Sequence, residues 1–482
     1  MRLIPVLNIL SILITPMSGI MLISAFIDFS YNNDNWVSFF SSAIITLFIG
    51  MSIFLATRGK SNKNLDLRQA FILTTFSWVS VALFGALPFY LSTLNLSFTD
   101  SFFESMSGIT TTGSTILSNI ELSPPGILVW RALLQWLGGI GVIVMALAVL
   151  PMLSIGGMQL FKTENFETPE KVIPRATGLA RGIFFVYSSL TIFWALLLYF
   201  SGMTWFDSIL HAMTTIATGG YSTKTASIGS FDSQTIDWII TFGMVVGSLP
   251  FIHYLAITRG SLKDITNDSQ VRWFFIFLIF IVLITFFLLL INSSYNWSDA
   301  IRYSAFNVTS ILTGTGYGNT DFGLWGGFAP TIFLLCMFLG GCAGSTTCGI
   351  RMFRIQVLAS TAHAQIIRLL RPHSIVLPHY NKKPIPESVT DAVMGFFVIY
   401  IIIFAITACI LSILGLDFIT AISGAATSIS NVGPGLGEVI GPAGNFSSIP
   451  DPAKWVLCFS MILGRLELFT ILVLLTPSFW KM

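Results

Sequence analysis

Charge is what this sequence lacks most. Only 10% of its 482 residues are Asp, Glu, Lys or Arg, whereas 54% are hydrophobic and 43 are Phe. A soluble domain carries about a quarter charged residues. The composition therefore excludes a soluble globular protein and predicts an all-α polytopic membrane protein. The formal net charge of +2 gives no indication of a nucleic-acid partner.

Signatures of metal sites and enzymes are also missing. We find no Walker motif, no HExxH and no Gly-x-Ser-x-Gly. The cysteines form no CxxC pair and lie in or beside apolar segments, which predicts buried structural thiols. No Pro/Ser-rich linker or charged tail marks a soluble domain. We therefore expect neither an enzyme nor a prosthetic group, and any soluble regulator would be a separate chain. The five cysteines are Cys336, Cys342, Cys348, Cys409 and Cys458.

Long apolar segments predict ten membrane crossings. Most reach the roughly 20 residues that a helix needs to span a bilayer. The first follows Arg2 and has no clear cleavage site, so we interpret it as a retained helix and not a signal peptide. The segments are 3–28, 37–57, 70–93, 126–155, 183–201, 236–258, 271–291, 329–341, 391–414 and 453–477.

Four shorter semi-polar segments alternate with these spans, and each leads into a glycine-containing loop. They are too short to cross, which favours re-entrant helices lining a water-filled cavity. The order of long helix, short helix, loop and long helix occurs four times, and such internal repetition indicates repeated architecture. The predicted units are an N-terminal helix pair (1–68), repeat 1 (69–156), repeat 2 (182–259), repeat 3 with a broken inner helix (271–356) and repeat 4 (388–482).

The four loops predict a shared ion site. The third, Thr313 to Gly318, reads Thr-Gly-Thr-Gly-Tyr-Gly. Carbonyls ringed around an axis can replace the water of a potassium ion, and glycine permits the backbone angles that this requires. One such loop would be an ordinary turn, but four in matching positions predict a pore. Acids near the short-helix starts suit the positive dipole end: Asp100, Asp207, Asp299 and Asp417.

Basic residues cluster on one predicted face. The positive-inside rule makes that face cytoplasmic, so both termini lie inside and the glycine loops face outward. The residues are Arg2, Arg58, Lys60, Lys63, Arg68, Lys162, Lys171, Arg175, Arg181, Arg259, Lys263, Arg272, Arg351, Arg354, Arg368, Arg371, Lys382, Lys383 and Lys481.

These loops, with the small-residue run from Gly340 to Thr347, resemble the bacterial Trk/Ktr potassium-uptake family and its TrkH branch in particular. The resemblance covers essentially the whole chain. It implies potassium uptake across the bacterial inner membrane through one pore of pseudo-four-fold symmetry, with two extra N-terminal helices. It also implies a homodimer in membrane lipid and a cytosolic nucleotide-binding ring protein of the TrkA type as gating partner.

The resemblance also assigns the filter residues. Gly113 is similar to the potassium-selective pattern, since related plant transporters with Ser there prefer sodium. Only the third loop approaches a full potassium-channel signature, which predicts a less regular filter and more modest discrimination. The expected filter glycines are Gly113, Gly219, Gly316 and Gly433, and the carbonyl-bearing neighbours are Thr111, Thr112, Ala217, Thr218, Gly314, Thr315, Asn431 and Val432.

Two features are expected below this filter. The run at 340–349 is either an unwound loop, because Gly and Ser sustain a helix poorly, or a close contact between membrane helices. The resemblance favours a gating loop. Arg465, midway along the last predicted helix, is functional by default, because a charge there is costly. A pair with Glu467, two residues away, is geometrically poor. The expected gating residues are Gly340, Gly341, Gly344, Ser345, Thr346, Gly349 and Arg465.

Other residues have simpler interpretations. His211 is expected to be a satisfied buried histidine, Arg131 an anchor at the membrane interface, and Arg302 a partner of an acid on the outer side.

One other kind of transporter remains open. A proton- or sodium-coupled secondary transporter also uses broken helices, but it usually carries inverted repeats and intramembrane acids. Here the four repeats run in the same orientation, and acids are scarce within the spans.

Overall fold

A computed structural model describes residues 3–59, 66–149, 157, 172–258, 260–261, 263–292 and 295–481. Within these residues, seven helices are long and apolar enough to cross a membrane, and two bent pairs bring the total to as many as nine. Helices dominate because, in lipid, every backbone polar group must be paired within the protein. The predicted all-α polytopic class is confirmed.

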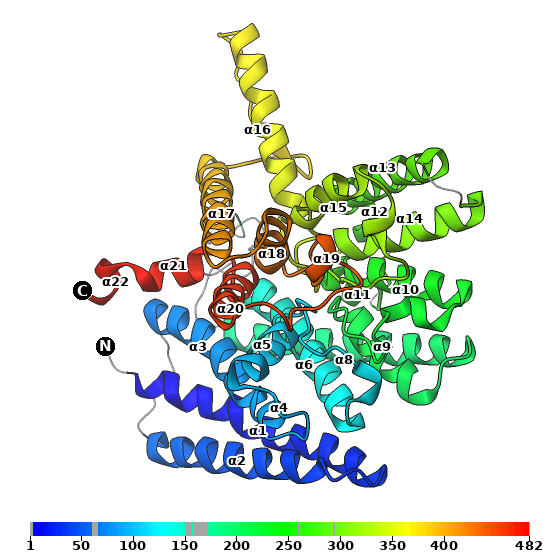
Figure 1. Ribbon diagram of the computed structural model, residues 1–482. Helices are drawn as coiled ribbons and strands as arrows, with labels where there is room; N and C mark the ends of the chain where they lie inside the picture. The colour runs from blue at the N-terminus through cyan, green and yellow to red at the C-terminus, as the bar shows by residue number, and fades with distance from the viewer. Residues whose placement is uncertain are drawn as a thin grey trace.

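The first two helices form an antiparallel pair at one edge of the molecule (Figure 1). They are α1 (Ile4–Ser30) and α2 (Trp36–Thr57). A buried carboxylate attaches them to the rest: Asp28 Oδ1 accepts from the Gly126 N–H at 2.6 Å, and Asp28 Oδ2 accepts from Asn35 Nδ2 at 2.9 Å. Gly126 lies in the first turn of α6, where helix N–H groups have no partner of their own.

The remaining helices fall into four similar units. In each, a short helix contacts the outer and inner long helices of its own unit. The outer helices are α3 (Leu67–Gly85), α8 (Val172–Phe200), α13 (Ser269–Asn292) and α17 (Glu387–Ile413). The short helices are α5 (Phe98–Ile109), α9 (Trp205–Ile216), α14 (Trp297–Leu312) and α18 (Phe418–Ser430). The inner helices begin with α6 (Pro125–Val144), α10 (Gln234–Gly247), α15 (Phe328–Phe338) and α20 (Asp451–Arg465).

Contacts between units close a ring. The inner helix of each unit contacts the short helix of the next, in the pairs α6 with α9, α10 with α14, α15 with α18, and α20 with α5. The last pair joins the fourth unit to the first, so all four surround one axis. The exact boundaries of the repeats stay a prediction.

Polar caps begin the short helices, and the predicted acids lie there. Ser97 Oγ and Thr204 Oγ1 accept from the Asp100 and Asp207 N–H groups, each at 3.1 Å. Asp417 is itself the N-cap of α18 and accepts from the Thr420 N–H. Asp299 lies in the first turn of α14. Acids near these helix starts suit the local dipole, as predicted.

The inner helices are not the continuous spans that the sequence predicted. The helix expected at 236–258 bends by 94° between α10 and α11 (Phe251–Ile257), because Pro250 has no N–H for a helix interior. The helix expected at 453–477 bends by 117° between α20 and α21 (Phe469–Leu475), where Glu467 and Leu468 have positive φ. The first inner helix, α6, ends in a π-helical turn at Met145–Val149.

The third inner helix is interrupted more deeply. Residues 339–351, which we call the inner loop, are non-helical and separate α15 from α16 (Met352–Leu370). Helix α16 was not predicted. It projects from the body (Figure 1) and leads to a hairpin of β1 (His379–Tyr380) and β2 (Lys383–Pro384).

Short helices complete the description: α4 (Leu87–Tyr90), α12 (Lys263–Asn267), α19 (Gly437–Ile440), α22 (Pro477–Lys481), and the 3₁₀ turns Ile120–Leu122, Ser227–Phe231 and Phe322–Leu324.

Part of the predicted basic face cannot be placed. Arg2, Lys60, Lys63, Lys162, Lys171 and Arg259 lie outside the described residues.

The Asp28 contact generates the first prediction. Replacing Asp28 with Leu removes the acceptor of two buried donors, and each unsatisfied donor costs about 1–3 kcal/mol. We expect a lower thermal unfolding midpoint in detergent. Asp34→Leu is the matched control, because Asp34 is exposed. Equal midpoints for the two variants would contradict the role of Asp28.

Candidate functional site: four loops around one axis

The loops after the short helices share one backbone geometry. In each, a residue with positive φ is followed by one without it and then by a glycine with positive φ. The middle residue donates its N–H to the carbonyl five residues earlier in all four loops. These equivalences align the three-residue segments Thr111-Thr112-Gly113, Thr218-Gly219-Gly220, Gly314-Thr315-Gly316 and Asn431-Val432-Gly433.

This alignment corrects the predicted register of the second loop by one residue. Gly220, with φ of 81°, and not Gly219, matches Gly113, Gly316 and Gly433. Gly219 takes the middle position, and Ala217 is the C-cap of α9, outside the segment. Two adjacent glycines made the registers indistinguishable by sequence. The positive φ of Gly220 decides between them.

The four glycines bind the loops into a ring. A Cβ on each would overlap the carbonyl oxygen of the middle residue in the next loop, so only glycine fits. The pairs run in order: Gly113 against Gly219, Gly220 against Thr315, Gly316 against Val432, and Gly433 against Thr112. Thr315 O also lies 3.6 Å from the Cβ position of Gly113. The middle carbonyls of the four loops therefore converge on the axis.

A pocket of about 70 Å³ lies on one side of the ring, and all four glycines line it. No group of three or more His, Cys, Asp or Glu side chains that could hold a metal occurs among the described residues. What the ring offers is backbone carbonyls, which suit a weakly held, desolvated alkali cation.

A buried polar network supports the first two loops from behind. Arg131 is 1% exposed, and its Nε donates to Glu104 Oε1 at 2.8 Å. The same guanidinium lies 4.0 Å from the ring centre of Tyr221, whose hydroxyl donates to the Glu104 carbonyl. Arg131 was expected to be an interface anchor, and that interpretation is wrong. Sequence could not pair it with Glu104, because they come from different helices.

Gln135, one helical turn further along α6, reaches the second loop. Its Nε2 donates to Gly219 O at 2.5 Å, and its Oε1 accepts from the Tyr221 N–H at 3.0 Å. No motif pointed to this residue.

The inner loop lies on the other side of the ring. Its neck is closed by two hydrogen bonds, from Gly340 N to Ile350 O and from Ile350 N to Phe338 O, each 2.9 Å. Gly344 and Gly349 have positive φ. Of the two interpretations left open by the sequence, an unwound loop and a helix–helix contact, the backbone adopts the first.

The inner loop contacts two of the four loops directly on this side of the ring. Thr218 Oγ1 donates to Thr346 Oγ1 at 3.0 Å, and Thr111 Oγ1 lies 4.0 Å from Cys348 Sγ. Thr346 and Cys348 are both buried. The loop thus fills the space directly beneath two of the four quadrants.

The broken helices hold the inner loop by backbone hydrogen bonds. Its Cys342 and Thr346 N–H groups donate to Ser248 O and Gly247 O, carbonyls freed where α10 ends. In return, the Phe251 N–H at the start of α11 donates to Gly344 O at 2.9 Å. The break in one inner helix is therefore satisfied by the break in another.

Arg465 also contacts the inner loop. It ends α20 and is 2% exposed. Its Nη1 donates to Thr346 O at 3.1 Å and contacts Cys348 Sγ, and its Nη2 donates to Gly138 O at 3.1 Å. Arg465 was expected midway along a helix; instead it lies at a helix end, bridging the inner loop and α6.

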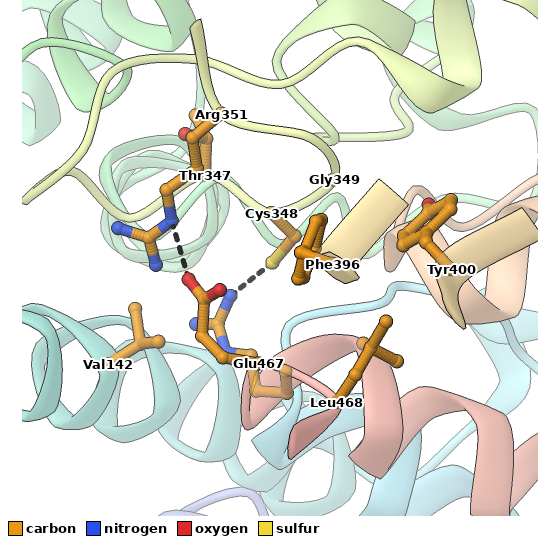
Figure 2. A pocket seen from close by; sticks show the side chains of 11 residues that line it. Val142, Thr347, Cys348, Gly349, Arg351, Phe396, Tyr400, Glu467 and Leu468 are labelled. Carbon is orange, nitrogen blue, oxygen red and sulfur yellow. Dashed lines mark hydrogen bonds and ion pairs between the residues drawn. The ribbon is translucent and has the colours of Figure 1, made fainter. Parts of the chain in front are cut away.

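Glu467 pairs with two other arginines. Its Oε1 lies 3.2 Å from Arg351 Nε (Figure 2). Its Oε2 accepts from Arg354 Nη2. Arg351 and Arg354 were counted with the basic face, but they are 3% and 0% exposed and belong to this buried cluster. The cavity that Figure 2 shows among these residues measures only about 10 Å³, room for about one water.

A second anchor of the inner loop leads to the start of α13. The Ala343 N–H donates to Gln270 Oε1 at 2.9 Å, and Gln270 Nε2 donates to Asp268 Oδ2 at 2.8 Å. His253 Nε2 lies 2.9 Å from the same carboxylate. Burial alone would raise the pKa of Asp268, but the hydrogen bonds of His253 and Gln270 lower it overall. The carboxylate is therefore held in its charged form.

Two simpler interpretations are confirmed. His211 is buried, with Nδ1 2.8 Å from Asp207 O and Nε2 3.0 Å from Ser222 Oγ, so both ring nitrogens are satisfied. Arg302 Nη2 donates to Asp299 Oδ1 at 3.0 Å.

Comparisons with known proteins agree with this geometry. Residues 37–482 match the family model TrkH, described as "Cation transport protein". The chain is 43% identical to the Trk system potassium uptake protein TrkI of Halomonas elongata over 86% of this chain and 84% of that protein. It is 36% identical to the Trk system potassium uptake protein TrkH of Escherichia coli strain K12, over 98% of each.

A solved structure is similar throughout. The crystal structure of the potassium transporter TrkH from Vibrio parahaemolyticus superposes with a TM-score of 0.92, at 36% identity and with 100% of both chains covered. The family model, the relatives and this structure each cover most or all of the chain, and we conclude that the chain belongs to the TrkH family of cation transport proteins.

Proposed function

We propose that this protein takes up potassium across the bacterial inner membrane through a channel-like pore. The observation that carries the proposal is the ring of four loops, in which glycines bring the carbonyls of neighbouring loops around one axis. Relatives of this chain are named potassium uptake proteins.

The filter would use backbone carbonyls from all four units. A potassium ion loses water on entry, and converging carbonyls replace it without a charged ligand. The ring is asymmetric, since its middle residues are Thr112, Gly219, Thr315 and Val432. Modest discrimination between potassium and sodium follows from that irregularity. The proposed filter residues are Thr111, Thr112, Gly113, Thr218, Gly219, Gly220, Gly314, Thr315, Gly316, Asn431, Val432 and Gly433.

The inner loop would be the gate, with Gly340, Gly341, Gly344, Ser345, Thr346 and Gly349 as its hinge and contact residues. It lies directly beneath the filter loops, and little space remains beside it. Ions could pass only after Thr346 and Cys348 move away from Thr218 and Thr111. Such a movement would have to break the contacts of Arg465 with the loop.

The filter pocket would face outward, and both termini would lie in the cytoplasm. Phe71 at the start of α3 packs edge-on against Phe479 near the C-terminus, with ring centres 6.5 Å apart. Asn8 of α1 donates to Thr57 at the end of α2. These contacts bring the two chain ends toward the end of α2 and the start of α3, and the positive-inside rule favours the cytoplasmic side for them.

Two partners complete the proposal, a second copy of the chain and a cytosolic nucleotide-binding ring protein of the TrkA type. Support comes from the family and from helix α16, which projects from the body (Figure 1). Its far end exposes apolar side chains, and such surfaces mark interaction sites. The exposed side chains are Ile366, Leu369 and Leu370 on the helix and Ile375 in the segment that follows it.

Flux measurements test the filter. In liposomes, potassium flux should exceed sodium flux and should not depend on a proton gradient. Equal fluxes would refute the filter, and strict proton dependence would favour a coupled transporter.

Gly220→Ala should reduce flux by about tenfold or more, because its Cβ would overlap the Thr315 carbonyl.

A matched control separates backbone strain from filter damage. Gly202 also has positive φ, but its Cβ would meet nothing within 4 Å. Gly202→Ala should therefore keep the wild-type flux per folded molecule. If both variants lost flux equally, strain alone would explain the effect of Gly220.

Replacing Arg465 with Ala tests the gate. The substitution removes the donors to Thr346 O and Gly138 O, which frees the inner loop and should raise basal potassium flux severalfold. The control is Arg302→Ala, because Arg302 is a partly buried arginine that contacts acids remote from the inner loop. Folded Arg465→Ala protein with unchanged flux would count against the gate.

A further inference from the structure

We propose that Gln135 sets the selectivity of the second quadrant by positioning the Gly219 carbonyl. This inference rests on the proposed filter. It assigns to a side chain of the first unit, on α6, the place that a side chain of the middle residue occupies in each of the other loops, and in addition a hydrogen bond to the carbonyl.

The middle positions of the loops show why a substitute is needed. Thr112, Thr315 and Val432 carry side chains there, whereas the second loop has Gly219. Gly219 has no positive φ, so its backbone does not require glycine. The three atoms nearest to a Cβ at Gly219 all belong to the side-chain amide of Gln135. Gln135, fully buried, therefore occupies the place of the missing side chain.

The amide fixes the loop at two points. Nε2 donates to Gly219 O at 2.5 Å, and Oε1 accepts from Tyr221 N at 3.0 Å, so one planar group spans the filter glycine Gly220. Because the donor and acceptor of an amide are rigidly connected, the spacing of the two backbone groups is also fixed. Across the described residues, no hydrogen bond reaches the carbonyls of Thr112, Thr315 or Val432.

This contact makes one carbonyl of the ring different from the others. Gly219 O lies against Gly113 in the neighbouring loop and also accepts a hydrogen bond from Gln135 Nε2. It can neither turn freely nor approach a smaller ion without breaking that hydrogen bond. A ring with one restrained oxygen should accommodate sodium less well than a ring whose oxygens all adjust.

Gln135→Met tests the role, because Met keeps the length of the side chain but loses both hydrogen bonds. We expect the potassium-to-sodium permeability ratio, from reversal potentials in planar bilayers, to fall about three- to tenfold, the size of one hydrogen bond. Gln356→Leu is the control. It removes a buried glutamine that makes two hydrogen bonds to Ser269, far from the filter, and should leave the reversal potential unchanged.

A compensating pair tests the substitution idea directly. Gly219→Thr alone should impair flux, because its side chain overlaps Gln135. Gln135→Ala with Gly219→Thr gives the second loop its own Thr, as in the first and third loops, and should restore flux, whereas the permeability ratio should stay low because no hydrogen bond restrains the carbonyl of residue 219. The reversal potential reports selectivity and not the amount of folded protein, so a purely structural role would not move it.

The outcomes separate this inference from the proposed function. A selective wild type with an unchanged ratio in Gln135→Met, or additive effects in the pair, overturns the role of Gln135. A wild type without preference for potassium overturns the proposed filter itself.

Discussion

Backbone hydrogen bonding without water is the constraint on which this structure depends. A helix that breaks inside a membrane leaves N–H and C=O groups that lipid cannot satisfy. Here the breaks satisfy one another: the carbonyls of Gly247 and Ser248 accept from the inner loop, and the inner loop accepts from Phe251. The interruption in the third unit is stable because the second unit is interrupted at the same level.

The ring of four loops depends on the same kind of mutual support. Each loop can adopt its conformation only if the next one places a carbonyl against its glycine, and the fourth loop returns to the first. No single loop is a binding site. The loop that most resembles a potassium channel, Thr313 to Gly318, contributes one quadrant, and its Tyr317 carbonyl accepts from Ser310 within its own unit. Gly316 therefore has the same role as Gly113, Gly220 and Gly433.

Sequence predicted most of the long spans, the short helices with their acids, and the four glycine loops, because these depend on local composition and on repetition. It did not predict the breaks in the inner helices. It placed the three-residue segment of the second loop one residue too early, because Gly219 and Gly220 are the same residue type and only the backbone φ angle distinguishes them. It missed the bend at Glu467, where the residues with positive φ, Glu467 and Leu468, are neither Pro nor Gly. Ion pairs with Arg351 and Arg354 hold Glu467 in that position. Helix α16 was missed because a search for long apolar segments finds membrane spans and does not find an amphipathic helix that projects from the body.

Buried charge beneath the ring of four loops adds a last constraint. The buried cluster contains three guanidinium groups, of Arg351, Arg354 and Arg465, and one carboxylate, of Glu467. Glu467 pairs with the first two, so Arg465 depends on the neutral groups Thr346 O, Gly138 O and Cys348 Sγ. A buried cation with only dipoles around it is costly to expose to apolar surroundings. If the inner loop left, Arg465 would lose Thr346 O and would need water in its place. In the proposed gate, water would therefore have to reach Arg465 whenever the inner loop opens the path.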